Sequence, residues 1–289
     1  MAFRTVVICN KAKLEYSLNY LVCRSDEIKR VLIDEISTLI IQNTCVSLTA
    51  ALMSELVKRK VKVIFCDEKS NPLAEVIPYA SSFESSSRIK NQIKWVDNVC
   101  GKVWKSIIEE KIRNQSFVLN TNMKVEKSNQ LLEYSDAVEE HDTTNREGHA
   151  AKVYFNSLFG NDFIRGSDKD TRNAYLNYGY AIILSAINRE IVSYGYLTQL
   201  GIHHIGETNP FNLGCDLMEP LRPLIDLIIT TKDINDDNFK SELSKVLSYP
   251  CRYNKIETYI DNAIHLYVGN VLSVLNEKEK EIKFIEYGV

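Results

Sequence analysis

The chain has 289 residues, of which 45% are hydrophobic and 25% charged, and its net charge is −3. These ordinary globular values exclude a disordered or fibrous chain, and the slight acidity does not favour a nucleic-acid binder, which usually carries excess Lys and Arg. No apolar run reaches the roughly 20 residues that span a bilayer, and no signal-peptide pattern is present, so we expect a cytoplasmic protein without membrane contact.

The first 77 residues carry the pattern of short β-strands. Segments rich in Val, Ile, Leu and Tyr alternate with polar breaks, which is typical of strands. One helix is expected among them, because Leu48, Leu52 and Leu56 recur at helical spacing. The expected strands are 4–9, 13–16, 19–23, 29–33, 37–41 and 62–66.

Residues 78–87 form a serine-rich stretch without periodicity, which indicates a linker. Beyond it, apolar residues recur at steps of three and four, the period of helices. The sequence therefore predicts an α+β protein with two domains: a small N-terminal mainly-β domain with one helix over 1–77, and a larger all-α domain over 88–289. The expected helices lie near 88–113, 122–139, 144–159, 171–199, 212–230, 237–247 and 254–276.

Three other chain-wide features limit the range of functions. The seven cysteines are scattered and never form a Cys-x-x-Cys pair, so we expect reduced thiols rather than disulfides or a zinc site. No glycine-rich phosphate loop is present, which does not support nucleotide hydrolysis. The tail from Glu277 to Lys283 alternates acids and bases, and we interpret it as a solvated helix end.

Glu147 is the first candidate for a catalytic residue. Helical spacing places it in line with Ala151, Tyr154 and Leu158, so its carboxylate points along the inward face of a helix, where a charge needs a partner. The alternative is structural, because Thr144-x-x-Glu147 matches a capping box in which the glutamate accepts a backbone N–H. This segment alone favours the cap.

The neighbouring pair His203 and His204 is the second candidate. The pair lies between Gly201 and Gly206, which break the helical pattern and indicate a loop. Imidazole is a common metal ligand and carries protons near neutral pH. Either histidine could equally be a surface or hydrogen-bonded core residue.

Asp216 and Glu219 form the third candidate. They lie three residues apart on one flank of a predicted helix, which the prolines of this segment should kink. Their coexistence is easier to understand if a cation lies between them, although an exposed flank paired with Arg222 or Lys232 is an alternative. Carboxylates with one imidazole suit Mg²⁺ or Mn²⁺, and such an ion supports phosphoryl transfer on DNA or RNA.

Four motifs carry a resemblance to a known family. They are Asn145-Arg146-Glu147-Gly148-His149-Ala150-Ala151, Tyr154-Phe155-Asn156-x-Leu158-Phe159-Gly160, Asn173-x-x-Leu176-Asn177-Tyr178-Gly179-Tyr180 and Asp216-Leu217-Met218-Glu219-Pro220-Leu221-Arg222-Pro223. In sequence and order they resemble the CRISPR spacer-acquisition integrases, especially those of type II-A systems. The resemblance spans essentially the whole chain and implies a β domain followed by a larger helical domain.

The resemblance implies a metal site and a reaction. In this family a glutamate, a histidine and a second acid bind the catalytic metal, and these positions correspond to Glu147, His204 and Glu219, with His203 as an alternative. Asp216 looks like an accessory acid that assists from outside the metal ligands or through water. The implied reaction is attack by the 3′-hydroxyl of a captured double-stranded DNA fragment on a phosphodiester at the end of a CRISPR repeat, with nuclease activity as the same displacement by water.

The resemblance also implies partners. Members of the family form homodimers that flank a central dimer of a small ferredoxin-like protein, with the captured fragment and the leader-repeat DNA as substrates. Type II-A relatives also work with the effector nuclease and a ring-shaped accessory protein that binds DNA ends. We expect phosphate contacts from Arg146 and Arg222 beside the acids and from Arg88, Lys90 and Lys94 in the basic segment 88–113.

Other interpretations stay open at this point. The basic segment could instead be a core helix with Trp95 and Trp104 buried and its lysines in solvent. A metal-dependent nuclease would cut nucleic acid without joining it. A non-catalytic DNA-binding scaffold would use the acids only as caps and salt-bridge partners.

Overall fold

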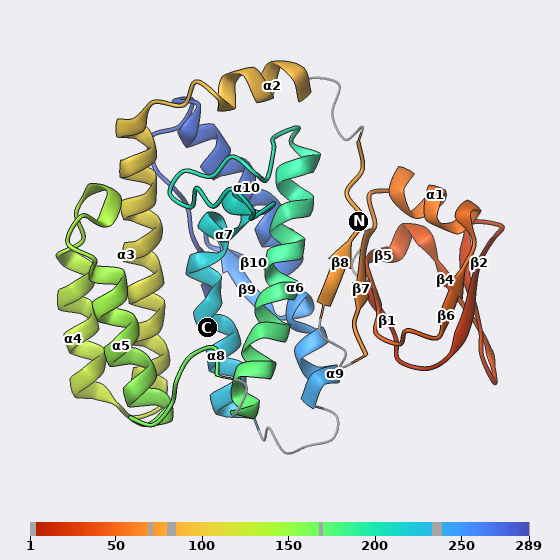
Figure 1. Cartoon of the computed structure of the whole chain (residues 1–289), viewed down its shortest axis with the longest axis horizontal. Coiled ribbons are helices and arrows are strands. Elements are labelled where there is room, and N and C mark those ends of the chain that lie inside the picture. The colour runs from red at the N-terminus through yellow and green to blue at the C-terminus, as the bar shows by residue number, and fades with distance from the viewer. Residues whose placement is uncertain (1–3, 69–71, 80–84, 168–169, 233–238, 289) are drawn as a thin grey trace.

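The computed structural model describes residues 4–68, 72–79, 85–167, 170–232 and 239–288. It is a mixed α/β structure in which a β-rich N-terminal region is followed by a mainly helical region (Figure 1). The N-terminal elements are β1 (Arg4–Ile8), β2 (Ala12–Ser17), β3 (Tyr20–Arg24), β4 (Ile28–Leu32), the 3-10 turn Ile33–Glu35, β5 (Ile36–Ile41), β6 (Val46–Leu48), α1 (Ala50–Lys58), β7 (Lys62–Cys66) and β8 (Pro72–Glu75).

The N-terminal strands form two sheets, with strand orders β1-β5-β7-β8 and β4-β3-β2-β6. The six predicted strands and the predicted helix are confirmed as β1 to β5, β7 and α1. The Thr49 side chain begins α1 by accepting a hydrogen bond from Leu52 N at 3.3 Å, as an N-cap residue does. β6 and β8 were not predicted, because their three and four residues are too few for a clear alternation.

Strand β5 lies between two hydrophobic cores. Successive side chains of a strand point to opposite faces, and both faces of β5 are buried. Leu39 and Ile41 belong to a smaller core that includes Leu52 of α1, whereas Ile40 belongs to the larger core of the helical region. Its parallel neighbour β7 also contributes to both cores, with Ile64 in the larger one. The β1-β5-β7-β8 sheet is therefore packed on both sides.

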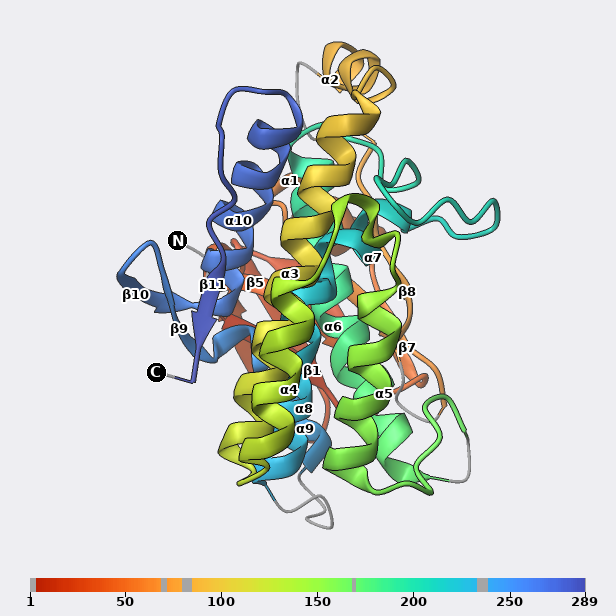
Figure 2. The ribbon, with the colours of Figure 1, turned by 90° about the vertical axis from the view of Figure 1, so that its left-hand side faces the viewer.

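The long helices of the second region stand side by side. Helices α3, α4 and α5 pack together, and α6 lies between them and the N-terminal sheets (Figures 1 and 2). The elements are α2 (Ser85–Gln92), α3 (Asp97–Thr121), α4 (Val125–Asp136), the 3-10 turn Glu140–Asp142, α5 (Arg146–Phe159), α6 (Thr171–Ser193), α7 (Asn212–Met218), the 3-10 turn Glu219–Leu221, α8 (Arg222–Thr231), α9 (Phe239–Ser244), the 3-10 turn Val246–Ser248 and α10 (Ile260–Leu275).

Each predicted helical segment contains an observed helix, with two interruptions. The segment 88–113 is broken between α2 and α3. The segment 212–230 is divided by the turn Glu219–Leu221 between α7 and α8, which confirms the predicted kink at its prolines. Residues 237 and 238, at the start of another predicted helix, lie outside the described residues.

The prediction of an all-α second region is wrong near its C-terminal end. Strands β9 (Pro250–Tyr253), β10 (Ile256–Tyr259) and β11 (Ile285–Tyr287) form an antiparallel sheet in the order β10-β9-β11. The helix predicted over 254–276 begins only at Ile260. Asn254 and Lys255, with φ of 50° and 67°, make the two-residue turn of the β9–β10 hairpin.

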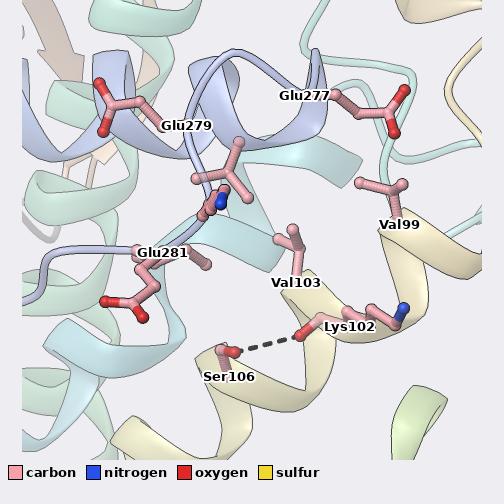
Figure 3. Close-up of a pocket in the computed structure, with 10 residues that line it drawn as sticks. Val99, Lys102, Val103, Ser106, Glu277, Glu279 and Glu281 are labelled. Atoms are coloured by element: carbon pink, nitrogen blue, oxygen red, sulfur yellow. Dashed lines mark hydrogen bonds between the residues drawn. The ribbon is translucent and has the colours of Figure 1, made fainter.

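The tail after α10 is mostly exposed, as we expected, but it is not the end of a helix. Helix α10 ends at Leu275, and the following loop is held by Asn270, whose Oδ1 accepts a hydrogen bond from Lys283 N at 2.7 Å. Figure 3 shows the glutamates of residues 277–281 beside a hollow of about 530 Å³, across from Lys102 of α3. The tail therefore covers part of α3 before it enters β11.

Two expectations from composition can be compared with the structure. In the part of the chain that is described, no helix is long and apolar enough to cross a membrane. All seven cysteines are free thiols, as expected for a reduced protein.

Candidate active site

Two of the predicted acids meet on one buried lysine. Lys111 lies in the middle of α3, Glu147 in the first turn of α5, and Glu219 in the turn between α7 and α8. The Nζ atom of Lys111 lies 2.5 Å from Glu147 Oε1 and 2.5 Å from Glu219 Oε2. The fold thus brings carboxylates from distant segments to a single cation.

Glu219 is ionised although it is buried. Burial raises the pKa of its carboxyl, but Lys111 and the Arg222 guanidinium outweigh this effect and bring the pKa to about 2. Arg222 Nε donates a hydrogen bond to Glu219 Oε1 at 2.8 Å. The exposed acidic flank considered from the sequence is wrong, because Asp216 and Glu219 are only 0% and 3% exposed. Of the two cations that the sequence suggested as partners of these acids, Arg222 does pair with Glu219, whereas Lys232 pairs with Glu242.

Glu147 does not form the predicted capping box. The Asp142 carboxylate accepts hydrogen bonds from Arg146 N at 2.7 Å and Glu147 N at 3.0 Å, and Asn145 Oδ1 accepts one from Gly148 N at 3.2 Å. These two side chains satisfy the first turn of α5, so the Glu147 carboxylate is left to contact Lys111. Sequence analysis missed Asp142, although an acid just before a helix start is a recognised capping signal.

The second pair of predicted residues, His204 and Asp216, forms a carboxylate–histidine unit. Asp216 lies in α7, and its Oδ1 is 2.6 Å from His204 Nδ1 and accepts a hydrogen bond from His204 N at 3.0 Å. Oδ2 accepts hydrogen bonds from the backbone N–H groups of Ile202 at 2.7 Å and His203 at 3.2 Å. The hydrogen bond to Asp216 raises the pKa of His204. With its Nδ1 proton directed at the carboxylate, His204 presents Nε2 as its free nitrogen.

Gly201 permits this loop to fold tightly over Asp216. A Cβ atom at position 201 would lie 2.4 Å from the His204 carbonyl oxygen and 2.7 Å from Asp216 Oδ2. Both distances are shorter than a carbon–oxygen van der Waals contact, so a side chain there would displace the loop. The glycine that indicated a loop in the sequence therefore also sets the position of His204.

The two adjacent histidines have different surroundings. The His203 ring stacks on Trp104, with centroids 4.0 Å apart and planes 5° from parallel, and burial lowers the pKa of His203. Only His204 has a carboxylate partner at its ring. Trp104 is fully buried, which agrees with the interpretation of the basic segment as a core helix. Trp95 is half-buried and stacks on Tyr196, with ring centroids 5.8 Å apart.

The predicted DNA-binding residues fall into two places. Arg146 lies beside Glu147 at the start of α5, and its Nε is buried without a hydrogen-bond partner among the described residues. Arg88 and Lys90 lie on α2 and Lys94 follows it, beside a hollow of about 650 Å³ that is lined by Gln92, Trp95 and His204.

A hollow of about 220 Å³ lies at the carboxylates. Some of the side chains that line it carry oxygen atoms that suit a hard divalent ion. Glu147, Glu219 and Gln115 line it, and the Oε1 of Gln115, a residue only 3% exposed, has no hydrogen-bond partner among the described residues. Carboxylate and amide oxygens are the donors that Mg²⁺ and Mn²⁺ prefer. Within the described ranges, no three His, Cys, Asp or Glu side chains are grouped closely enough to hold a metal. His204 lines the neighbouring hollow instead.

Comparisons with known proteins give a consistent result. The family described as CRISPR associated protein Cas1 matches residues 6–257. The chain is 36% identical over 230 residues to the CRISPR-associated endonuclease Cas1 of Neisseria meningitidis serogroup C (strain 8013), which covers 79% of this chain and 75% of that protein.

Two solved structures have the same fold. A casposase bound to its integration product has a TM-score of 0.75 and 19% identity, covering 98% of this chain and 92% of that chain. A chain of a Cas6-RT-Cas1–Cas2 complex has a TM-score of 0.71 and 16% identity, covering 96% of this chain and 35% of that chain. At these identities the likeness shows the fold alone.

Proposed function

This chain belongs to the Cas1 family of CRISPR-associated proteins, and we propose that it is a metal-dependent integrase and endonuclease of CRISPR adaptation. Its substrates would be captured double-stranded DNA fragments, inserted at the repeats of a CRISPR array. The observation that carries this proposal is the convergence of Glu147 and Glu219 on one buried cation. The name of the endonuclease relative and the casposase with its integration product support the same reaction class.

The proposed cofactor is Mg²⁺ or Mn²⁺, with Glu147, Glu219 and His204 as its ligands. The oxygen donors around the small hollow support this choice, including the unpartnered Gln115 Oε1. A divalent ion would compete with the Lys111 ammonium for the two carboxylates, and His204 would have to approach them from the adjoining hollow. When bound, such an ion activates an attacking oxygen and neutralises charge that develops on a phosphodiester.

The residues of this chain would orient the reaction. Asp216 holds His204 Nδ1, which leaves Nε2 to bind the ion or accept a proton. Arg222 and Arg146 lie next to the acids and would contact phosphate oxygens. The 3′-hydroxyl oxygen of the fragment forms a new ester bond to phosphorus, and the bond from phosphorus to the 3′-oxygen of the repeat strand breaks. One phosphodiester replaces another, so no nucleotide hydrolysis is required.

The proposed partners follow from the family and from the structures with the same fold. We propose a homodimer that binds the captured fragment and the leader-repeat DNA together with a small ferredoxin-like protein. The neighbour that contains Cas1 with Cas2 supports such an assembly. The type II-A effector nuclease and a ring-shaped protein that binds DNA ends complete the proposed set.

A strand-transfer assay tests the proposal. A labelled short duplex with free 3′-hydroxyls is incubated with supercoiled plasmid carrying a repeat, the small partner protein, and Mn²⁺ or a chelator. Wild type should attach the label covalently at a repeat end only with metal. Glu219→Ala should reduce joining at least about 100-fold, because it removes a proposed ligand. Glu242→Ala, which changes an exposed acid paired with Lys245, is the matched control and should join normally.

Two other outcomes would contradict the proposal. Label that is cut but never joined would identify a nuclease without a joining role. Duplex bound equally by wild type and Glu219→Ala, with no chemistry in either, would identify a scaffold.

A further inference from the structure

Arg165 is an arginine of the candidate active site that sequence analysis did not single out. It lies in the connection between α5 and α6 (Figure 2) and is half-buried. Its side chain lines the same hollow of about 220 Å³ as Glu147 and Glu219. Arg165 therefore borders the space in which the proposed reaction would take place.

Neutral groups hold the Arg165 guanidinium in place. Nη1 donates a hydrogen bond to Asn173 Oδ1 at 2.9 Å, and Nη2 donates one to Asn177 Oδ1 at 2.8 Å. The guanidinium carbon lies 5.2 Å from the centre of the Tyr180 ring. A guanidinium has five N–H donors, and these bonds use two of them. The group is thus fixed in direction and retains donors for another acceptor.

The other cations of the hollow already have acidic partners. Lys111 contacts both carboxylates, and Arg222 contacts Glu219. Among the described residues, Arg165 has no carboxylate within ion-pair distance. Among the described residues that line this hollow, Arg165 is the cation without an acidic partner.

Asp226 is the remaining acid that lines the hollow, and both of its carboxylate oxygens accept hydrogen bonds from tyrosines. Its Oδ2 accepts a hydrogen bond from Tyr154 Oη at 2.8 Å, and its Oδ1 accepts one from Tyr180 Oη at 2.5 Å. Burial raises the pKa of Asp226, and the charges of Arg165 and Arg222 offset only part of this rise. Asp226 therefore leaves the Arg165 donors available.

We propose that Arg165 binds a phosphate of the DNA strand next to the phosphodiester that reacts, as a subsite separate from Arg222. The inference rests on the proposed function, because that function brings DNA into the hollow. A planar guanidinium held by two amides suits two-point recognition of phosphate oxygens. It also gives Asn173 and Asn177 a role, that of orienting this arginine. A free phosphate ion has the same chemistry, and the experiment separates the two sources.

The test measures DNA binding by fluorescence anisotropy in EDTA over a series of NaCl concentrations. Arg165→Gln should lower the slope of log K against log salt by about 0.9, the value for one lost phosphate contact. Its affinity near 0.1 M salt should fall about tenfold. Arg172→Gln is the matched control, because it also removes an arginine that lies over aromatic rings, but one that Asp170 already pairs. It should leave the slope unchanged.

An unchanged slope in Arg165→Gln would overturn the inference. Thermal protection by inorganic phosphate that wild type shows and Arg165→Gln lacks, together with an unchanged DNA slope, would assign the site to free phosphate and also overturn it. Should Arg165→Gln fail to fold by circular dichroism, Arg165→Lys decides the question. It keeps the charge without the planar fork, so it should keep the slope and lose affinity, and wild-type affinity would contradict the inference.

The same preparations separate this inference from the proposed function. Wild type is assayed for joining with Mn²⁺ in parallel. If wild type does not join DNA, the proposed function fails, while the salt dependence of Arg165→Gln still decides whether Arg165 contacts phosphate. If wild type joins DNA and Arg165→Gln binds with an unchanged slope, only the inference about Arg165 fails.

Discussion

Two partly buried clusters of acids and cations among the described residues differ in how completely their charges are paired. The junction cluster consists of Arg189, Glu190, Asp261 and His265, where α6 meets α10 and β5. Arg189 contacts Glu190 at 2.5 Å and Asp261 at 2.6 Å, and it also donates to the Ser37 carbonyl of β5 at 3.1 Å. His265 Nδ1 lies 2.7 Å from Glu190. Both acids of this cluster have cationic partners within the chain.

The active-site cluster of Lys111, Glu147, Glu219 and Arg222 is incomplete by comparison. It opens on a hollow where, among the described residues, Gln115 Oε1 has no hydrogen-bond partner and Arg165 has no acidic partner. A cluster that pairs its charges internally stabilises the fold, because burying an unpaired charge is costly. A cluster that leaves a donor and an acceptor open at a hollow has the features of a binding site.

The largest expected effect is on the stability that the junction cluster provides. Arg189→Met would remove the cation that the buried Glu190 shares with the half-buried Asp261, so we expect the free energy of unfolding to fall by about 3–5 kcal/mol. Urea denaturation would measure the change. Arg59→Met is the control, because it removes a surface partner of Asp34 and should reduce the free energy of unfolding far less. Equal losses in the two variants would remove the distinction between the clusters.

A second prediction uses the opposite pKa shifts of two buried acids. Burial raises the pKa of Glu190, but His265 and Arg189 outweigh it and lower the value to about 2. Burial raises the pKa of Asp226 to about 6, and its tyrosine hydrogen bonds offset only part of this. Because the folded pKa of Asp226 exceeds its unfolded value near 3.8, its stabilising contribution is complete below pH 3.8 and is lost as the pH rises through about 6.

Asp226→Asn removes this pH dependence. Relative to the variant, wild type should lose about 3 kcal/mol of unfolding free energy between pH 4 and pH 8, which corresponds to a shift of about two pKa units. Urea denaturation of both proteins across this pH range gives the difference directly. A constant difference would mean that Asp226 is ionised throughout and that a cation pairs it, as in the junction cluster.

The smallest predicted effect concerns the orientation of His204. Asp216→Asn keeps the size of the side chain but removes the charge that directs the imidazole, so joining should slow about 10- to 100-fold, as for other carboxylates behind a ligating histidine. Mn²⁺ affinity, followed by electron paramagnetic resonance, should fall within the same range. The exposed substitution Asp34→Asn serves as a control and should change neither quantity. Unchanged Mn²⁺ affinity in Asp216→Asn would make Asp216 a purely structural loop anchor.

Local patterns predicted most of the fold, and each miss has a physical cause. The alternating segments became β1 to β5 and β7, and the helical periodicity became the long helices. The hairpin before α10 was missed because its turn, Asn254-Lys255, lacks the glycine that usually identifies such turns, and apolar residues on both sides imitate a helical period. The tail after α10 was misread because its fold depends on the distant contact from Asn270.

Sequence patterns singled out the acids, His204 and Arg222 of the candidate site, but not Lys111 or Arg165. Glu147 meets Glu219, and His204 meets Asp216, which no local pattern could establish because each contact joins separate segments. Lys111 was counted only as one of the lysines of the basic segment 88–113. Its position carried a signal, since it lies on the same helical face as the buried Ile107 and Ile108. Arg165 had no such signal, because its direction is set by asparagines of α6.

The contact between Arg189 and β5 also affects the register of this strand. Shifting the register of a strand by one residue exchanges the faces of all its side chains, and polarity normally opposes such a slip. In β5 that exchange would move Leu39 and Ile40 between two apolar cores. The polarity of these two side chains therefore does not oppose a slip of this strand. Arg189 donates a hydrogen bond to the Ser37 carbonyl, and Ser37 Oγ donates one to the Arg4 carbonyl at 3.2 Å. These two hydrogen bonds favour one register of β5.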